Sequence, residues 1–302
     1  MGGGEPTGGG EVNETRIADR VALTVTDGIA RVRLSRPDKR NALDGAMFRA
    51  IAEAGARVAA MREVRAVVLS GEGASFCAGL DFASFAQMAG ASGDGAASGD
   101  GAASGDGAAS GDGASGPGGI GVLSEDGITH LAQRICWVWQ EVPVPVIAAL
   151  QGHALGGGMQ LALGADLRVA HPEVQMSMRE VYWGLVPDMT GTLMLSRLVR
   201  DDVAKDLVFS ARIVRGEEAL ALGLVTRLAA DPLTAAEALA AEIAGRSPDA
   251  VRAAKTLINR LSNEGAAAHF AEERRLIATL IGSPNQVEAV TANFEQRAPR
   301  FA

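Results

Sequence analysis

The chain of 302 residues is 47% hydrophobic and 21% charged, which suits a globular protein with a full hydrophobic core. Its formal net charge of −8, without any basic block, argues against nucleic-acid binding, because phosphate contacts need clustered lysine and arginine. No apolar run approaches the roughly 20 residues of a membrane-spanning helix, so we expect no membrane partner.

The first segments of the chain predict a tail and a hairpin. Residues 1–14 are glycine-rich and polar and lack the apolar stretch of a signal peptide, so we expect a disordered tail on a cytoplasmic protein. Apolar and polar residues then alternate over 21–25 and 30–34, on either side of Asp27 and Gly28. This alternation around an Asp-Gly pair is typical of a β-hairpin.

A helix, a strand and a glycine-rich turn follow. Asp44 can cap a helix with apolar residues on one face, and residues 66–69 indicate a short buried strand that runs into a glycine-rich turn at 71–81. Beyond this turn, Gly-Ala-Ala-Ser-Gly-Asp occurs three times in tandem within 95–112. Because these residues bury almost nothing apolar, we expect a disordered insert over 90–119 within a domain.

A second buried strand leads into a second glycine turn. We expect a helix from about residue 124 to 141 and a strand over 144–150. The strand runs into the glycine-rich residues 152–158, and 159–163 have a helical pattern. A strand that enters a helix through glycines leaves unpaired backbone N–H groups at the helix N-terminus, where negative charge is favoured. From this stretch alone, a ligand site and a simple tight turn are both open.

The rest of the chain is mostly helical. Residues 166–170 and 174–178 are predicted strands, and the second delivers Glu180 into a loop; Thr190 can cap the helix after it. The helical segments beyond are 201–210, 216–222, 232–245, 248–263, 265–281 and 284–297. The last four have too little strand between them to join a sheet, so we expect them to form a separate helical layer or arm.

Several of these pieces, in this order and spacing, resemble the crotonase (enoyl-CoA hydratase/isomerase) superfamily. The matching residues are Arg36-Pro37, 41–43, 76–81, 145–149, 152–158, Asp166, Glu180, Gly184-Leu185 and 294–301. The resemblance implies an α/β fold, with a crotonase-like spiral of ββα turns over 15–230 and a helical oligomerisation region over 231–302. It also implies a homotrimer or a dimer of trimers.

The resemblance gives the two glycine turns one shared purpose. Members of the superfamily bind an acyl-CoA thioester and hold its carbonyl oxygen between two backbone N–H groups, which here would belong to Leu80 and Gly157. Fixed dipoles stabilise the negative oxygen of a thioester enolate without reorganising, and one such donor is typically worth about 10²–10³ in rate. No cofactor is implied, because coenzyme A arrives as part of the substrate.

Side chains over the pocket would decide the reaction. In hydratases of the superfamily two glutamates flank the substrate and act on the water that is added, and their positions match Gln160 and Glu180. An amide neither takes nor gives a proton at neutral pH, so hydration here should be slow or the reaction different. Dienoyl-CoA isomerases have a second carboxylate that matches Asp188. The alternatives are that Asp188 caps the helix beginning near Met189 and that Glu180 is a loop carboxylate in a salt bridge.

Other positions match places where the superfamily contacts coenzyme A. Lys39 and Ala78 match positions at the nucleotide, and Phe294 and Arg297 match positions that reach the coenzyme A of a neighbouring subunit. A solvated turn lysine, helix packing and a surface charge are the alternatives for Lys39, Phe294 and Arg297. The further substrate-binding candidates are Asp81, Gly156 and Trp183.

Three functions therefore stay open. The leading hypothesis is an acyl-CoA enzyme that shifts a double bond or adds water, with Glu180 central and Asp188 assisting. Another crotonase reaction, such as thioester hydrolysis or C–C cleavage, is the second, and a catalytically idle acyl-CoA-binding protein that lacks one acid at Gln160 is the third. The histidines share no metal-ligand spacing, so we expect no metal, and Cys77 and Cys136 are expected to be reduced packing thiols.

Overall fold

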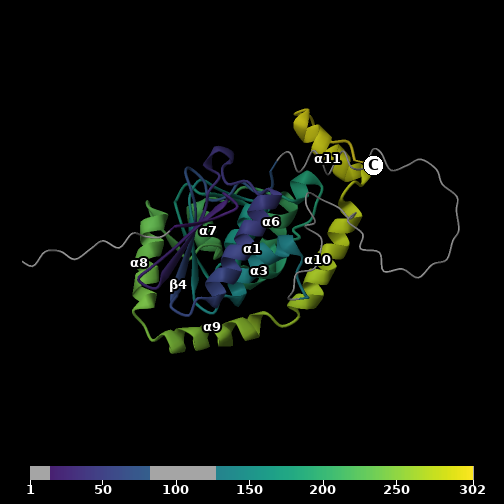
Figure 1. Ribbon diagram of the computed structural model, residues 1–302. Helices are drawn as coiled ribbons and strands as arrows, with labels where there is room; N and C mark the ends of the chain where they lie inside the picture. The colour runs from purple at the N-terminus through teal and green to yellow at the C-terminus, as the bar shows by residue number, and fades with distance from the viewer. Residues whose placement is uncertain (1–13, 82–126, 302) are drawn as a thin grey trace, which may run out of the picture.

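A computed structural model describes residues 14–81 and 127–301 (Figure 1). Apart from Glu14, the tail predicted over 1–14 and the insert predicted over 90–119 lie outside these residues. The main sheet has the order β1-β2-β3-β4-β5-β7-β9, in which β1 to β3 are antiparallel and the later neighbours pair in parallel. Its strands are β1 (Thr15–Ile17), β2 (Val21–Thr26), β3 (Ile29–Leu34), β4 (Ala66–Gly71), β5 (Val146–Leu150), β7 (Leu167–Ala170) and β9 (Arg227–Leu228).

The predicted hairpin is confirmed. Strands β2 and β3 pair from Val21 with Leu34 to Thr26 with Ile29. Asp27 and Gly28, the two turn residues, have φ angles of 53° and 75°. Two successive left-handed residues make the turn whose twist matches paired strands, which is why Asp-Gly marks it in a sequence.

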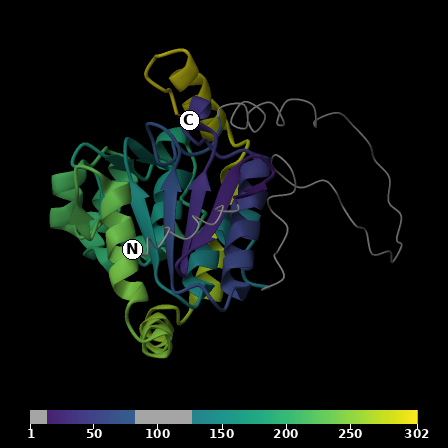
Figure 2. The ribbon, with the colours of Figure 1, turned by 60° about the vertical axis from the view of Figure 1, so that its left-hand side comes forward.

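Helices cover both faces of the sheet (Figures 1 and 2). On one face α1 (Gly45–Ala60) packs against α3 (Leu131–Glu141). The predicted cap of α1 is confirmed, because the Asp44 side chain accepts the N–H of Met47. On the other face lies α8 (Pro232–Ala244), whose Leu239 and Ala240 share a core with β4 and β5. The expectation that α8 belongs to a layer separate from the sheet is therefore wrong.

One helix start and one helix cap differ from prediction. Helix α3 begins at Leu131 and not near residue 124, because His130 caps it: Nδ1 of His130 accepts the N–H of Gln133, and the Gln133 amide oxygen accepts the N–H of His130. Thr190 stands at the N-cap of α5 (Gly191–Leu198), but its hydroxyl makes no cap hydrogen bond. Its φ of 69° places the residue in the left-handed region instead.

The other helices lie at the ends and sides of this core. They are α4 (Gly157–Gly164), α6 (Asp201–Ser210), α7 (Gly216–Leu222), α9 (Pro248–Ser262), α10 (Ala266–Leu280), α11 (Pro284–Phe294) and the short turns η1 (Pro37–Lys39) and η2 (Val181–Trp183). In Figure 1 α9 crosses one end of the sheet and α10 runs back along the side of the molecule, and in Figure 2 α9 is seen end-on below the sheet. Assembly of these helices into trimers stays a prediction. Within residues 14–81 and 127–301, no helix combines the length and hydropathy that crossing a membrane needs.

An ion pair between the buried Lys255 and the partly exposed Asp166 connects α9 to the core. Lys255 donates from Nζ to an Asp166 carboxylate oxygen at 2.7 Å and to the carbonyl oxygens of Trp139 and Val144. The same Asp166 oxygen accepts the N–H of Val146 at the start of β5. One carboxylate therefore links the helical end of the chain to the central strand that leads into the second glycine turn.

Candidate active site

The two glycine turns lie side by side, joined through a small second sheet. This sheet pairs β6 (His153–Leu155) with β8 (Gln175–Ser177) in parallel, and Cys77 bridges to Ala154 beside it. Cys77 donates its N–H to the His153 carbonyl at 2.8 Å and accepts the Leu155 N–H at 3.1 Å. A strand segment of the first turn thus runs beside the strand that opens the second.

Glycine is required where the turns meet. A Cβ on Gly79 would lie 2.6 Å from the Leu155 carbonyl oxygen, and a Cβ on Gly158 would lie 2.2 Å from the Cys77 carbonyl oxygen. Real Cβ atoms do not approach this closely, so any side chain there would push the turns apart. Gly156, at φ 51° and ψ −122°, adopts a backbone conformation that other residues avoid.

Two backbone donors at the meeting point have no partner within the described residues. The residues on either side of Leu80 are held, because Leu43 donates to the Gly79 carbonyl and accepts the Asp81 N–H. Among residues 14–81 and 127–301, neither the Leu80 N–H nor the Gly157 N–H donates a hydrogen bond. Gly157 opens α4, where the helix dipole favours negative charge. Two unpaired donors beside a cavity suit a developing oxyanion.

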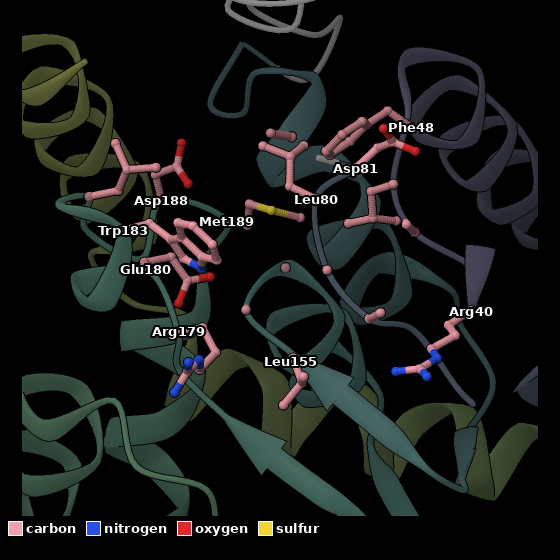
Figure 3. A pocket seen from close by; sticks show the side chains of 18 of the residues that line it. Arg40, Phe48, Leu80, Asp81, Leu155, Arg179, Glu180, Trp183, Asp188 and Met189 are labelled. Atoms are coloured by element: carbon pink, nitrogen blue, oxygen red, sulfur yellow. The ribbon is translucent and has the colours of Figure 1, made fainter. Parts of the chain in front are cut away.

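A cavity of about 430 Å³ opens over these donors (Figure 3). Glu180, Trp183 and Asp188 approach it from one side, and Leu80 and Phe48 lie across from them in Figure 3. Arg40 and Arg179 lie on either side of Leu155. Much of the wall is apolar, including Leu43, Leu185, Met189, Ile277 and Ile281.

Glu180 is the buried carboxyl of this cavity, with 9% of the residue exposed. Its Oε1 accepts a hydrogen bond from the Gln160 amide nitrogen at 2.6 Å, and its buried Oε2 has no partner among the described residues. Burial raises the pKa of Glu180 to about 7, although the Gln160 hydrogen bond acts in the opposite direction. The salt-bridge alternative is wrong for Glu180 in the described part of the chain, which supplies no basic partner.

Asp188 reaches the same cavity from the turn before α5. Burial first, then the charges of Glu180 and Glu273, raise the pKa of Asp188 to about 8. The alternative role as a helix cap is wrong, because α5 begins at Gly191 and Thr190 occupies the cap position. Two carboxyl groups that titrate near neutrality in one cavity can divide the roles of base and acid.

Gln160 differs from its expected place as a group that acts on the substrate. It is completely buried in α4 and does not border the cavity. Its amide nitrogen donates to Glu180, and its oxygen accepts the N–H groups of Met189 at 2.9 Å and Gly191 at 3.0 Å. Both the nitrogen and the oxygen of the Gln160 amide are therefore hydrogen-bonded to protein groups, and neither borders the cavity.

The predicted substrate-binding residues divide into two sets. Bordering the cavity are Lys39, Ala78, Asp81, Gly156 and Trp183. Within the wall Asp81 is held by Arg36, whose guanidinium donates to its carboxylate at 2.7 Å. The exposed Phe294 and Arg297 do not border the cavity, and Arg297 pairs with Glu288 and Glu295 near the C-terminus. Their contact with the coenzyme A of a neighbouring subunit stays a prediction.

Sequence reasoning missed Arg40, Phe48 and Arg179 as cavity residues. Arg40 has a φ of 49° in the turn after η1, and Arg179 lies 4.0 Å above the ring of Tyr182. Position next to Lys39 and Glu180 is the signal that could have found the two arginines. Cys77 stays a packing residue, because burial raises the pKa of its thiol to about 12.

Comparison with known proteins identifies the family. A family model described as "Enoyl-CoA hydratase/isomerase" matches residues 29–302. The chain belongs to the enoyl-CoA hydratase/isomerase family. Relatives of this family member include enoyl-CoA hydratase domain-containing protein 2, mitochondrial, from Bos taurus, which is 34% identical over 91% of this chain and 84% of its own length. The Homo sapiens protein of that name is 32% identical over 97% of this chain and 91% of its own length.

Solved structures agree with the crotonase fold of this family member. An enoyl-CoA hydratase/isomerase from Pseudoalteromonas atlantica T6c superposes with a TM-score of 0.75 at 27% identity, covering 94% of this chain and all of that one. The α/β fold predicted from the resemblance is confirmed. The two mammalian relatives carry "mitochondrial" in their names, so a cytoplasmic location stays only a prediction for this chain.

Proposed function

We propose that this member of the enoyl-CoA hydratase/isomerase family moves a double bond along the acyl chain of a CoA thioester, with Glu180 as base and Asp188 as acid. One observation carries the proposal. Glu180 and Asp188 border the same apolar cavity as Leu80 and Gly157. By contrast, the side chain of Gln160, at the position of a second hydratase glutamate, does not border the cavity and is hydrogen-bonded to protein groups.

The proton steps balance within this cavity. Ionised Glu180 takes a proton from carbon, and the electron pair moves onto the thioester oxygen, which the N–H groups of Leu80 and Gly157 stabilise. As the enolate collapses, protonated Asp188 gives its proton to another carbon of the conjugated system. One hydrogen and one double bond change place, so the reaction needs no oxidant or cofactor. Before the next turnover a proton passes from Glu180 back to Asp188 through solvent.

The protonation states support this division of roles. With a pKa of about 7, a substantial share of Glu180 is ionised near neutral pH, while Asp188, with a pKa of about 8, is mostly protonated. A general base and a general acid work best when their pKa values lie near the working pH. The apolar wall also keeps water from competing for the enolate.

The decisive experiment compares thioester substrates in wild type and two variants. We expect wild type to convert 3-enoyl-CoA or 3,5-dienoyl-CoA, followed by the absorbance of the conjugated thioester and by mass spectrometry. Glu180→Gln should lower kcat by about 10²–10⁴, and Asp188→Asn should also abolish most isomerisation, because each removes a proton-transfer group. Asp202→Asn, at an exposed ion pair on α6, is the control and should match wild type.

Other outcomes identify the competing functions. Turnover of 2-enoyl-CoA to a hydroxyacyl product that survives Asp188→Asn would mark a hydratase. Release of free coenzyme A would mark a thioester hydrolase, and a shortened acyl product would mark C–C cleavage. Tight binding without turnover of any thioester would mark an idle binding protein. Full activity in Glu180→Gln would end the assignment of Glu180 as the base.

A further inference from the structure

One buried amide touches both segments that carry the candidate catalytic carboxyls. From the middle of α4, Gln160 donates to Glu180 Oε1 at 2.6 Å and accepts the N–H groups of Met189 and Gly191. The N–H between them, on Thr190, goes to Glu273 Oε2 of α10 at 3.1 Å. Two buried side chains therefore hold three successive N–H groups immediately after Asp188.

The bridge needs an amide and not a carboxylate. An amide side chain carries donors at one end and an acceptor at the other, whereas an ionised carboxylate only accepts. The fit is also tight, because a Cβ on Gly191 would lie 2.5 Å from Gln160 Cγ and 2.6 Å from its Oε1. Glycine at the first position of α5 thus allows the amide to approach the two N–H groups.

We propose that Gln160 is a positioning residue, which orients Glu180 and the turn bearing Asp188 relative to each other and leaves Glu180 Oε2 as the proton-accepting oxygen. This inference rests on the proposed function. Oε1 is occupied by the amide, and Oε2 is the buried oxygen that has no partner in the described part of the chain. Glutamine at position 160, where hydratases of the family have a glutamate, then supplies no acid and instead holds Glu180 and the turn after Asp188 by hydrogen bonds.

Charged groups around the bridge come from three directions. Asp188 faces the cavity, Glu273 approaches from α10, and Arg179 precedes Glu180 and lies over the Tyr182 ring. Glu273 is also held by the Gln133 amide and the Thr192 hydroxyl, with His269 at 3.5 Å. The pH dependence of any Gln160 variant therefore reports on Glu180 and Asp188 together.

The test replaces Gln160 by methionine, which is similar in size and makes none of the three hydrogen bonds. We expect Gln160→Met to lower kcat by about 10²-fold with a much smaller change in KM, because a misplacement of about 1 Å costs that much. The acidic limb of the pH profile of kcat should move to higher pH, since Glu180 loses the hydrogen bond that favours its charged form. The matched control is Gln140→Met, which removes an amide bonded to the carbonyl of Gly164 at the other end of α4.

A second variant covers the case in which Gln160→Met does not fold. Gln160→Glu keeps the acceptor for both N–H groups and, while it shares one proton with Glu180, keeps the donor as well. At mildly acidic pH, Gln160→Glu should retain about tenfold more turnover than Gln160→Met. The acidic limb of its pH profile should also lie at higher pH than that of wild type. Unchanged kcat and an unmoved acidic limb in the folded variants would overturn the proposal.

A readout without turnover separates this inference from the proposed function. Infrared difference spectra, assigned with Glu180→Gln, follow the titration of the Glu180 carboxyl directly. If wild type turns over no thioester, the proposed function fails, and a higher Glu180 titration midpoint in Gln160→Met would still support the bridge. The same midpoint in wild type, Gln160→Met and Gln140→Met would refute the bridge whatever the activity.

Discussion

Gly158→Ala tests whether the contact between the two glycine turns sets the rate. A methyl group at this position would lie 2.2 Å from the Cys77 carbonyl oxygen and 3.0 Å from Cys77 Cβ. Ordinary contact begins at 3.4 Å, so the turns must separate by about 1.2 Å to admit it. Cys77 also accepts the Leu155 N–H, so the displacement would reach the segments that carry Leu80 and Gly157.

The size of the effect follows from this displacement. Alanine is better than glycine in a helix by roughly 0.5–1 kcal/mol, while overpacking costs about 1–3 kcal/mol, so we expect a net loss of roughly 1–2 kcal/mol. Misplacing one oxyanion donor should lower kcat by about 10²–10³. Steady-state isomerisation and urea unfolding measure the two effects separately.

Gly245→Ala is the matched control for this prediction. Its Cβ would meet the carbonyl oxygens of Glu242 at 3.4 Å and Ala241 at 3.6 Å, both ordinary contacts, at the end of α8, and Gly245 does not border the cavity. It should leave kcat at the wild-type value. An unchanged kcat in folded Gly158→Ala would refute the claim that the distance between the turns controls the enolate step.

Three more predictions concern charge. The pH profile of kcat should be bell-shaped, rising as Glu180 ionises around pH 7 and falling as Asp188 loses its proton around pH 8; a flat profile over this range would contradict the assignment. Glu273→Gln removes a charge that raises the pKa of Asp188, so the alkaline limb should move to lower pH, and an unmoved limb would exclude this coupling. Lys255→Met leaves Asp166 without its cation, so the free energy of unfolding measured in urea should fall by an amount near the lower end of about 3–5 kcal/mol, because Asp166 is partly exposed. Adding Asp166→Asn should recover part of this stability. Full stability of the single variant would show that the ion pair is dispensable.

Local patterns predicted the elements whose cause is local. The Asp27-Gly28 turn depends on two adjacent residues, and the helices α6 and α7 have the predicted limits because their periodicity and neighbouring turns determine them. The start of α3 was missed because a histidine fills the capping role that is usually taken by serine, threonine or aspartate. The position of α8 was missed because an apolar helix face does not identify its partner.

By itself the sequence determined that the chain has two glycine turns, a glutamate and an aspartate eight residues apart, and an amide in place of an acid. Those features depend on residue type and short-range spacing, so they are visible without coordinates. Only the tertiary structure decided that Gln160 donates a hydrogen bond to Glu180 and that Asp188 borders the cavity instead of capping α5. These outcomes arise from the packing of α4, α5 and α10, which brings together residues that no local pattern relates.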